Sequence, residues 1–374
     1  MKKDTIMFDG YYGFQNVGDD VFCLVAEWIA NECWKFNNIY FNGENIPKLY
    51  NNSRKNQSTK MNKKIKKLST LMTLFKSSHI VYAGGSNFHT ALSGIGDLRN
   101  FYRFSTKFTK KLYALGVSLG PFDTKRDYES IKNYLNNFTY ISLRDKRSYE
   151  IAKKMNLRGV CKQSFDIASL LPVINKKYYR QRIDNNKKDE LVVGISLCHC
   201  ERYSGKDINR EIQREEVMKL LIDKMVEKYK RITLKFFVFN NNKISGDNEI
   251  TIESLNIFKS KCKVELINYT KDTLWFWNEM KKCNLFIGIR LHSAIMSYMA
   301  NIPFVLFEYH EKCTEFLNSI GYSQKDRIIV EKFDVIKYLS VIDRLIKNDY
   351  KYKLKPSELT EHVLNDIKEC ANFI

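Results

Sequence analysis

Short apolar runs alternate with stretches of helical spacing along most of the chain. The runs occupy residues 5–8, 39–42, 80–83, 112–117, 140–143, 191–197, 233–239, 264–267, 285–289 and 304–307. Continuous apolar runs of this length are typical of strands that are buried on both faces of a parallel sheet. Between them, apolar residues recur at helical spacing, as in residues 21–32 and 215–229. Strands that alternate with helices predict α/β domains.

The pattern is interrupted once and then restarts, which predicts two domains. A chain of 374 residues is longer than chains that usually fold around a single hydrophobic core. Residues 175–190 are rich in Lys, Arg, Asn and Asp, the composition of a linker. We therefore expect two Rossmann-like, doubly wound domains, residues 1–178 and 190–350, that face a central cleft. Residues 351–374 contain a further helix that could return to the first domain.

One unit of strand, turn, helix and strand carries the clearest candidate chemistry. Arg290 and His292 stand in the turn between strand 285–289 and a helix predicted over residues 293–300, which Pro303 brings to an end. Ligands bind parallel sheets at the carboxyl ends of strands, and helix N-termini attract anions. A guanidinium and an imidazole at this spot predict a site for a negatively charged ligand. Alternatively, Arg290 caps sheet carbonyls and His292 is a hydrogen-bonded core residue.

Other predicted strands also end in residues that suit ligand binding. Paired glycines let a backbone approach a ligand, and carboxylates complement the start of a helix. The candidates are Lys312 and His310 after strand 304–307, Gly84, Gly85 and His89 after strand 80–83, Arg144 after strand 140–143, and Gly18, Asp19 and Asp20 in the glycine-rich loop after strand 5–8. That loop lacks the lysine and the glycine spacing of a nucleotide-binding motif.

Part of the net charge of +20 is concentrated in one polybasic segment, residues 45–96. This segment contains no Asp or Glu, and its nine positive charges are Lys48, Arg54, Lys55, Lys60, Lys63, Lys64, Lys66, Lys67 and Lys76. Such a segment suits an anionic substrate, an anionic membrane surface or nucleic acid. No zinc finger or RNA-recognition pattern accompanies it, so we expect no nucleic-acid partner. A lysine-rich overall composition is the simpler explanation.

Residues 61–75 of this segment have helical spacing. Opposite a lysine-rich face they carry Ile65, Leu68, Leu71, Met72 and Phe75. The apolar face could lie on an anionic leaflet, which would give weak membrane contact. It could instead pack on the domain and leave the lysines in water. We expect the second arrangement.

Cysteine usage and the N-terminus indicate a cytoplasmic protein, either free or peripheral at the inner face of the membrane. The nine cysteines are scattered, which fits reduced thiols. Cys198, His199 and Cys200 lack the further ligands that a zinc site needs, so we expect no metal. Residues 1–9 contain no apolar signal-peptide core, and no stretch is long and apolar enough to span a membrane.

Together these motifs resemble the polysaccharide pyruvyl transferase family. The resemblance rests on Gly-Tyr-Tyr-Gly-Phe-Gln-Asn-Val-Gly-Asp-Asp at residues 10–20, Gly84-Gly85-Ser86, residues 116–120, Ser142-Leu143-Arg144-Asp145 with Ser148, Asp166, Gly288-Ile289-Arg290-Leu291-His292 and residues 309–312. These blocks occur in the family's order and span almost the whole chain. Asp20 is a departure, because many members have Glu at that position.

The resemblance implies a GT-B-like architecture with the active site in the cleft. Members of the family transfer the enolpyruvyl group of phosphoenolpyruvate to two hydroxyls of a sugar as a cyclic ketal. By resemblance, His292 is the catalytic histidine, and the donor is held by Arg144, Arg290, Lys312 and Ser293. The cleft-lining candidates on the acceptor side are Gly18, Asp19, Asp20, Gly84, Gly85, His89 and His310. No cofactor is implied beyond phosphoenolpyruvate as co-substrate, and the acceptor would be a sugar or a lipid-linked oligosaccharide.

The candidate residues also fit this chemistry without the resemblance. Guanidinium groups match the geometry of carboxylate and phosphate, and an imidazole exchanges protons near neutral pH. No metal is required for the step. Two other functions stay open. A nucleotide-sugar-dependent GT-B glycosyltransferase would share the fold, although the second domain offers no obvious carboxylate for a ribose. The protein could also be a non-catalytic binding protein. In that case the position of Arg144, Arg290 and His292 at strand ends would be a coincidence.

Overall fold

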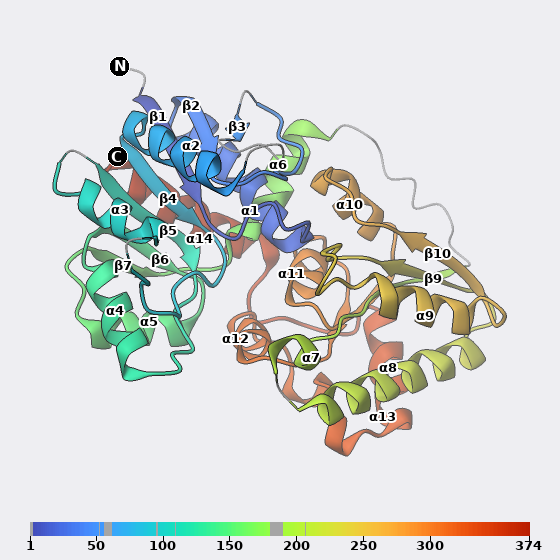
Figure 1. Ribbon diagram of the computed structural model, residues 1–374. Coiled ribbons are helices and arrows are strands. Elements are labelled where there is room, and N and C mark those ends of the chain that lie inside the picture. Colours follow the sequence, from blue (N-terminus) through green and yellow to red (C-terminus); the bar gives the residue numbers. More distant parts are fainter. Residues whose placement is uncertain are drawn as a thin grey trace. The chain divides into compact units, whose positions relative to one another are not determined.

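The computed structural model describes residues 3–51, 53–55, 62–94, 96–108, 110–179, 190–205 and 207–374 (Figure 1). The chain forms two compact units, each built on a parallel sheet. The first unit comprises the described parts of residues 1–14, 19–174 and 357–374, and the second comprises those of residues 15–18 and 175–356. Within the described residues, no helix is both long and apolar enough to cross a membrane.

The first unit is organised around a seven-stranded sheet of order β3-β2-β1-β4-β5-β6-β7. All of its strand pairs are parallel. The strands are β1 Lys3–Asp9, β2 Phe36–Phe41, β3 Arg54–Lys55, β4 His79–Ala83, β5 Lys111–Val117, β6 Phe138–Leu143 and β7 Val160–Gln163. Its α-helices are α1 Val17–Trp28, α2 Lys63–Lys76, α3 Leu98–Ser105, α4 Lys125–Leu135, α5 Lys146–Met155, α6 Leu171–Tyr178 and α14 Pro356–Ala371, of which α1, α6 and α14 each have residues in the second unit.

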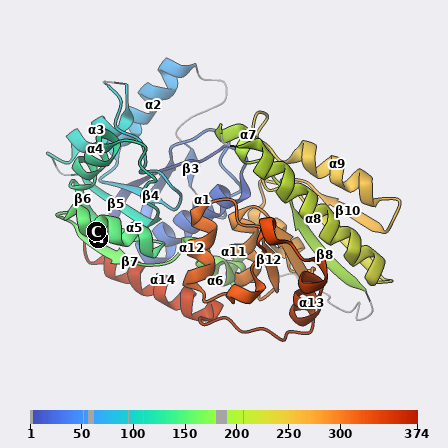
Figure 2. The same cartoon turned by 90° about the horizontal axis from the view of Figure 1, so that it is seen from below.

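The two faces of this sheet are covered by different helices. One face packs Leu112 and Ala114 of β5 against side chains from α2, α3, α4 and α5. Because side chains alternate along a strand, Tyr113 points to the other face. There its hydroxyl donates to the carbonyl of Phe373, 2.7 Å away, and the hydroxyl of Tyr140 donates to the carbonyl of Asp366 at 3.3 Å. The C-terminal helix α14 therefore closes the second face (Figure 2).

The second unit has a five-stranded parallel sheet of order β10-β9-β8-β11-β12. Its strands are β8 Leu191–Ser196, β9 Ile232–Phe237, β10 Lys263–Ile267, β11 Leu285–Gly288 and β12 Phe304–Leu306. Its α-helices are α7 Glu201–Ser204, α8 Ile208–Lys228, α9 Asn248–Phe258, α10 Thr273–Met280, α11 Leu291–Met299, α12 Glu311–Ser319 and α13 Val335–Ile346. Side chains of α8, α9 and α13 pack on one face of the sheet. On the other, Phe276 of α10 packs against Phe237 and Phe239.

The predicted fold class, two Rossmann-like α/β domains, is confirmed, while several element boundaries were wrong. Helix α1 begins at Val17 rather than at residue 21, and α8 begins at Ile208 because Asp207 caps it. Helix α11 begins at Leu291, so Arg290 is its N-cap and His292 already lies in its first turn. Residues 175–178 belong to α6 rather than to a linker, and residues 180–189 lie outside the described residues. Strands β3 and β7 and helices α3, α6, α7, α12 and α13 were not predicted.

The attachment of α14 to the first unit can be tested by its buried side chain Ile367, which is 1% exposed. Replacing Ile367 with Ala should cost about 2–5 kcal/mol of unfolding free energy, because it removes buried methyl groups and leaves a cavity. Calorimetric unfolding measures the loss. The exposed Asn365 of the same helix, replaced by Ala, is the control and should leave the transition nearly unchanged. Equal stability of both variants would mean that α14 is not part of this core.

Candidate functional site

The turn from β11 to α11 in the second unit is tightly built. A Cβ atom on Gly288 would lie 2.0 Å from Oγ of Ser293, so a side chain cannot fit between the strand and the first helical turn. Ser293 is buried, and its hydroxyl donates to the carbonyl of Arg290 at 2.6 Å. These contacts fix Arg290 as the N-cap residue, at the end of the helix where backbone N–H groups and the helix dipole favour anions.

The side chain of Arg290 is held by a buried carboxylate. Its Nε donates to Oδ2 of Asp247 at 3.1 Å, and its Nη2 donates to Oδ1 of the same residue. Asp247 is fully buried and also accepts the backbone N–H of Asn240 at 3.0 Å. Nη1 of Arg290 makes no hydrogen bond with any described residue, and the side chain is 18% exposed. One edge of the guanidinium is thus oriented by the protein, and the other can bind a ligand.

Burial and pairing oppose each other at this ion pair. Burial alone lowers the pKa of Arg290, but the charge of Asp247, its hydrogen bond and the neighbouring Cys198 and Tyr309 together outweigh burial, and the pKa of the guanidinium is raised well above its usual value. Burial raises the pKa of the Asp247 carboxyl, and the neighbouring Arg290 lowers it in part. A guanidinium remains protonated at any relevant pH, so we describe the pair as ionised. The guanidinium therefore keeps its positive charge, and the carboxylate of Asp247 balances it.

His292 is enclosed by a segment from the start of the chain. A Cβ atom on Gly18 would lie 2.1 Å from Nδ1 of His292, so only glycine fits at that position beside the imidazole. Residues 15–18 are fixed to the second unit by a bridge between Asn16 and Asn240 and by the N–H of Val17, which donates to the carbonyl of Phe239 at 2.8 Å. The glycine-rich loop thus contributes Gly18 directly to the surroundings of His292.

Two further cations lie near the ring of Tyr309, which follows β12. Nζ of Lys312 is 5.8 Å from the ring centre, and the guanidinium carbon of Arg214 is 5.9 Å from it. His310 caps α12, because its Nδ1 accepts the backbone N–H of Lys312 at 3.3 Å. Burial raises the pKa of the Tyr309 hydroxyl well above its usual value, which keeps it neutral. The Arg290 charge also acts on this hydroxyl, so Tyr309 belongs to the same site.

The thiols of Cys198 and Cys200 lie close to this cationic group. Their sulfur atoms are 3.0 Å apart. The hydrogen bond from Cys198, together with the charges of Arg290 and Arg214, lowers the pKa of Cys200. Arg214 itself is paired with Glu201 through two hydrogen bonds, the longer of them 2.8 Å.

His199 does not join these thiols in a ligand set but lies against α8. Its Nδ1 is 2.7 Å from Oε1 of Glu215 and 3.4 Å from Oε1 of Glu211. Glu211 already accepts the backbone N–H groups of Cys200 at 2.6 Å and Glu201 at 2.8 Å, and it pairs with Arg202. Its oxygens are therefore engaged in fixing the turn before α7, and we assign this cluster a structural role.

Arg144 connects strand ends of the first unit. Its Nε donates to Oγ of Ser118 at 2.7 Å, its Nη1 to Oδ2 of Asp166 at 2.8 Å, and its Nη2 to Oγ of Ser86 at 3.1 Å. Ser86, Ser118 and Asp166 follow β4, β5 and β7, and Arg144 itself follows β6. The guanidinium thus connects the carboxyl ends of four strands, and its side chain is only 8% exposed.

The remaining candidates of the first unit lie at the same edge of its sheet or at the start of α1. Gly84 has a positive φ of 72°, and a Cβ atom there would lie 2.3 Å from the ring of Phe22. Gly85 has φ 85°, which also favours glycine. His89 is exposed, and its Nδ1 lies 3.0 Å from the carbonyl oxygen of Ser86. Asp19 and Asp20 lie in the first turn of α1, where their charge complements the helix dipole.

The predicted site residues are therefore divided between the units. The second unit brings together Gly18, Arg290, His292, Ser293, His310 and Lys312, and the first unit contains Asp19, Asp20, Gly84, Gly85, His89 and Arg144. The sequence analysis missed Asp247 and Arg214. A signal existed for Asp247, because it follows the predicted strand 233–239 and so belongs to the same sheet edge as Arg290. Arg214 precedes the helix predicted over residues 215–229, so the sequence did not indicate that it belongs to a helix near the site.

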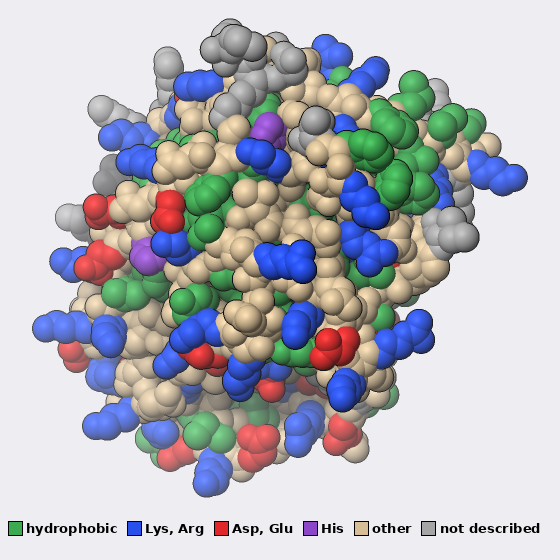
Figure 3. All heavy atoms as spheres, turned by 90° about the vertical axis from the view of Figure 1, so that its left-hand side faces the viewer, with side chains coloured by type: hydrophobic (Ala, Val, Ile, Leu, Met, Phe, Trp, Pro, Cys, Tyr) green, Lys and Arg blue, Asp and Glu red, His purple; other side chains and the backbone are tan. Residues whose placement is uncertain are grey.

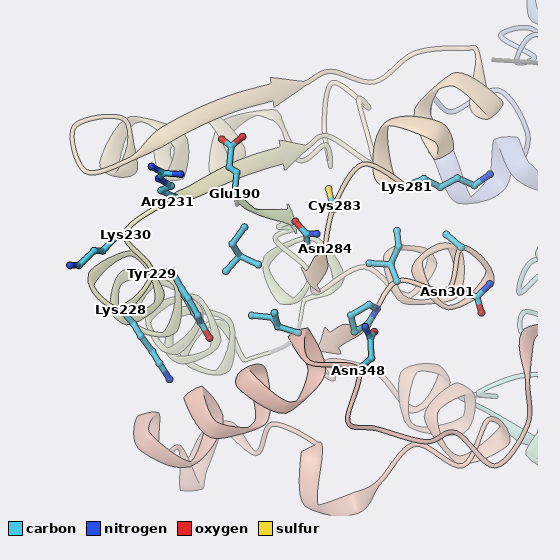
Figure 4. A pocket seen from close by; sticks show the side chains of 15 residues that line it. Glu190, Lys228, Tyr229, Lys230, Arg231, Lys281, Cys283, Asn284, Asn301 and Asn348 are labelled. Atoms are coloured by element: carbon cyan, nitrogen blue, oxygen red, sulfur yellow. The ribbon is translucent and has the colours of Figure 1, made fainter. Parts of the chain in front are cut away.

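A pocket of about 920 Å³ lies elsewhere on the second unit (Figure 4). It is lined by residues that precede strands, including Arg231 before β9, Asn284 before β11 and Pro303 before β12. It therefore lies at the amino ends of the strands, whereas Arg290 and Lys312 follow the carboxyl ends. The helix N-termini and the paired guanidinium are at the carboxyl edge, so we place the candidate site there.

Solved structures with a similar fold are UDP-GlcNAc 2-epimerases. The enzyme of Methanocaldococcus jannaschii is 11% identical, with a TM-score of 0.65 over 99% of this chain and 99% of its own. The Rickettsia bellii enzyme is 12% identical, with a TM-score of 0.59 over 100% and 98%. The Neisseria meningitidis enzyme bound to UDP-GlcNAc is 8% identical, with a TM-score of 0.58 over 99% and 98%. These likenesses show a GT-B-like fold of two Rossmann-like domains.

The sequence itself matches a protein family over most of its length. No curated protein matches the chain. The profile described as polysaccharide pyruvyl transferase matches residues 16–311, which include Gly18, Arg144, Arg290 and His292 and end one residue before Lys312. This match confirms the resemblance seen in the motifs. The chain belongs to the polysaccharide pyruvyl transferase family.

Proposed function

We propose that the protein transfers the enolpyruvyl group of phosphoenolpyruvate to a sugar as a cyclic ketal and releases phosphate. The observation that carries this proposal is the geometry of Arg290. Asp247 holds one edge of its guanidinium, Nη1 at the other edge makes no hydrogen bond with any described residue, and His292 lies two residues on, in the first turn of α11. Such an arrangement suits a small anion with a reactive centre close to its charged groups.

The proposed step needs one proton donor and two nucleophilic hydroxyls. A sugar hydroxyl adds to C2 of phosphoenolpyruvate and gives up its proton, while C3 takes up a proton. A second hydroxyl then displaces phosphate from C2, its proton leaves with the phosphate, and the ketal ring closes. His292 is the proposed general acid and base, because imidazole exchanges protons near neutral pH. Its position beside Gly18 limits the motion of the ring and so holds it in one orientation.

The proposed donor contacts come mainly from the second unit. Arg290 binds the carboxylate or the phosphate through Nη1, and Lys312 of α12 supplies a second positive charge. Ser293 contributes indirectly, since its hydroxyl is occupied by the carbonyl of Arg290. Arg144 is proposed as a donor ligand from the family motif, and its three hydrogen bonds would orient it for that purpose. No metal or cofactor is part of this proposal.

The proposed acceptor is a sugar of a polysaccharide or of its lipid-linked precursor, modified in the cytoplasm. Asp19, Asp20, Gly84, Gly85 and His89 are the proposed acceptor-side residues of the first unit, and His310 and Gly18 those of the second. The alternative is a glycosyltransferase that uses a nucleotide sugar. It is favoured by the UDP-GlcNAc bound to the Neisseria meningitidis epimerase, a protein of similar fold. The family match over residues 16–311 favours pyruvyl transfer.

The role of Arg290 predicts a specific loss of donor affinity. Arg290→Lys should raise the Kd for phosphoenolpyruvate about tenfold to a hundredfold, because a hydrogen bond to a charged group contributes about 1.5–3 kcal/mol and Lys lacks the planar fork. Isothermal titration calorimetry measures it. Arg344→Lys is the matched control, since Arg344 is also paired with a carboxylate, Asp326, but lies on α13. Unchanged affinity in both Arg290→Lys and Arg290→Ala would contradict the donor site.

The contact between Gly18 and His292 predicts a loss of turnover instead. The methyl group of Gly18→Ala must displace the imidazole, and a displacement of about 1 Å can lower a rate on the order of a hundredfold. We expect kcat to fall by one to two orders of magnitude and donor affinity to change little. Gly94→Ala is the control, because a Cβ atom there meets nothing within 4 Å. A fully active Gly18→Ala variant would remove His292 from the proposed mechanism.

The reaction itself is tested by supplying phosphoenolpyruvate with a panel of sugar and lipid-linked sugar acceptors. We expect phosphate release that depends on the acceptor and a product whose mass increases by a pyruvyl ketal. UDP-sugars should neither be consumed nor compete with phosphoenolpyruvate, because they lack the carboxylate close to a phosphate that the proposed cations would bind. Turnover of a UDP-sugar with no binding of phosphoenolpyruvate would establish the glycosyltransferase alternative.

A further inference from the structure

Helix α2 of the first unit exposes the apolar stripe that the sequence analysis expected to be packed. Ile65 is 49% exposed, Leu68 58%, Met72 54% and Phe75 78%. The helix packs on the domain through other residues, including Leu74, which is 3% exposed, and the buried Thr70 and Thr73. Of the five predicted side chains Leu71 packs against the core, so the expected burial is wrong for the other four. Four large apolar side chains on one face of a helix remain in water.

The end of α3 extends this surface. Phe104 is 58% exposed and Phe108 is 69% exposed, and their ring centres are 5.4 Å apart. The two helices are adjacent, because Nζ of Lys67 on α2 lies 5.5 Å from the ring centre of Phe101 on α3. Farther along, Nζ of Lys110 donates to the carbonyl of Phe75 at 3.1 Å. We call the six side chains the α2–α3 patch, namely Ile65, Leu68, Met72, Phe75, Phe104 and Phe108.

Positive charge accompanies the patch. On α2 and α3 and in the residues that follow α3, the cations include Lys64, Lys67, Lys76, Arg103, Lys107 and Lys110. Asp97 is the one acidic residue of the sequence between residues 45 and 111, and it is paired with Arg99 at 2.7 Å. Figure 3 shows hydrophobic side chains gathered at the upper right of its view, with lysine and arginine side chains beside them.

The chemistry of the patch distinguishes among its potential occupants. Two copies of this chain that met through it would bring like charges together, because a two-fold interface joins the same surface of both copies. Nucleic acid offers bases that stack on aromatic rings but nothing that would cover Ile65, Leu68 and Met72. An anionic bilayer offers acyl chains for the apolar stripe and phosphate groups for the cations that flank it.

We propose that the α2–α3 patch docks the protein on anionic membrane. Helix α2 lies in the interface with its exposed stripe in the acyl boundary, and the surrounding lysines contact lipid phosphates. The docking goes beyond the proposed reaction and uses none of its residues. It would keep the enzyme at the surface that presents a lipid-carried acceptor.

Vesicle sedimentation with the full chain tests the proposal. The vesicles contain phosphatidylcholine alone or with about 30 mol% of the anionic lipid phosphatidylglycerol, which gives a negative surface potential, and neither phosphoenolpyruvate nor sugar is added. We expect binding to the anionic vesicles that weakens as salt rises, because surface charges are screened over about 10 Å at 0.1 M.

Leu68→Ser with Phe75→Ser should lower the partition coefficient about tenfold or more, since burial of each side chain contributes more than about 1 kcal/mol. Lys64→Gln with Lys76→Gln should lower it about tenfold as well.

The control variant is Ile336→Ser on α13, whose side chain is 77% exposed and lies outside the patch. It should bind vesicles as the wild type does. Equal binding of the wild type to both vesicle types, or undiminished binding of the Leu68→Ser, Phe75→Ser variant, would overturn the proposal. So would a concentration-dependent dimer that this variant abolishes, because the patch would then be a contact between copies. Because no substrate is present, failure of pyruvyl transfer would not affect the result.

Discussion

The pairing of Arg290 with the fully buried Asp247 is the interaction on which the candidate site depends. A buried carboxylate without a partner would be costly, and so would a buried guanidinium. Because each satisfies the other, one edge of the guanidinium is fixed in direction. The tight turn between Gly288 and Ser293 then sets where that direction points relative to the N-terminus of α11. The charge of the Arg290 guanidinium, its fixed orientation and the dipole of α11 thus all act at the N-terminus of this helix.

The glycine-rich loop has a different function from the one that its composition suggests. Glycine-rich turns after a first strand often approach phosphate groups directly. Here the absence of a side chain at Gly18 makes room for the imidazole of His292, which comes from the opposite end of the sequence. The constraint on Gly18 therefore arises from a protein side chain.

The sequence predicted the strands and the edge at which functional residues gather, because buried parallel strands are short apolar runs and ligand sites follow them. It could not predict which residues pair across that edge. Ser86, Arg144 and Asp166 were each recognised in separate motifs, yet their hydrogen bonds depend on strand order.

The packing of α2 was mispredicted for another reason. Its buried face carries Thr70 and Thr73, whose hydroxyls donate to carbonyls of their own helix, so polar residues occupy an interior position.

The central claim is that phosphoenolpyruvate binds at the carboxyl edge of the second sheet, against Arg290. A crystal structure of the protein soaked with phosphoenolpyruvate tests it most directly. The account predicts a carboxylate or phosphate oxygen within hydrogen-bonding distance of Nη1 of Arg290, with C3 of the ligand facing His292. Phosphoenolpyruvate bound only in the pocket at the amino ends of the strands, or no bound ligand at a concentration that supports turnover, would contradict it.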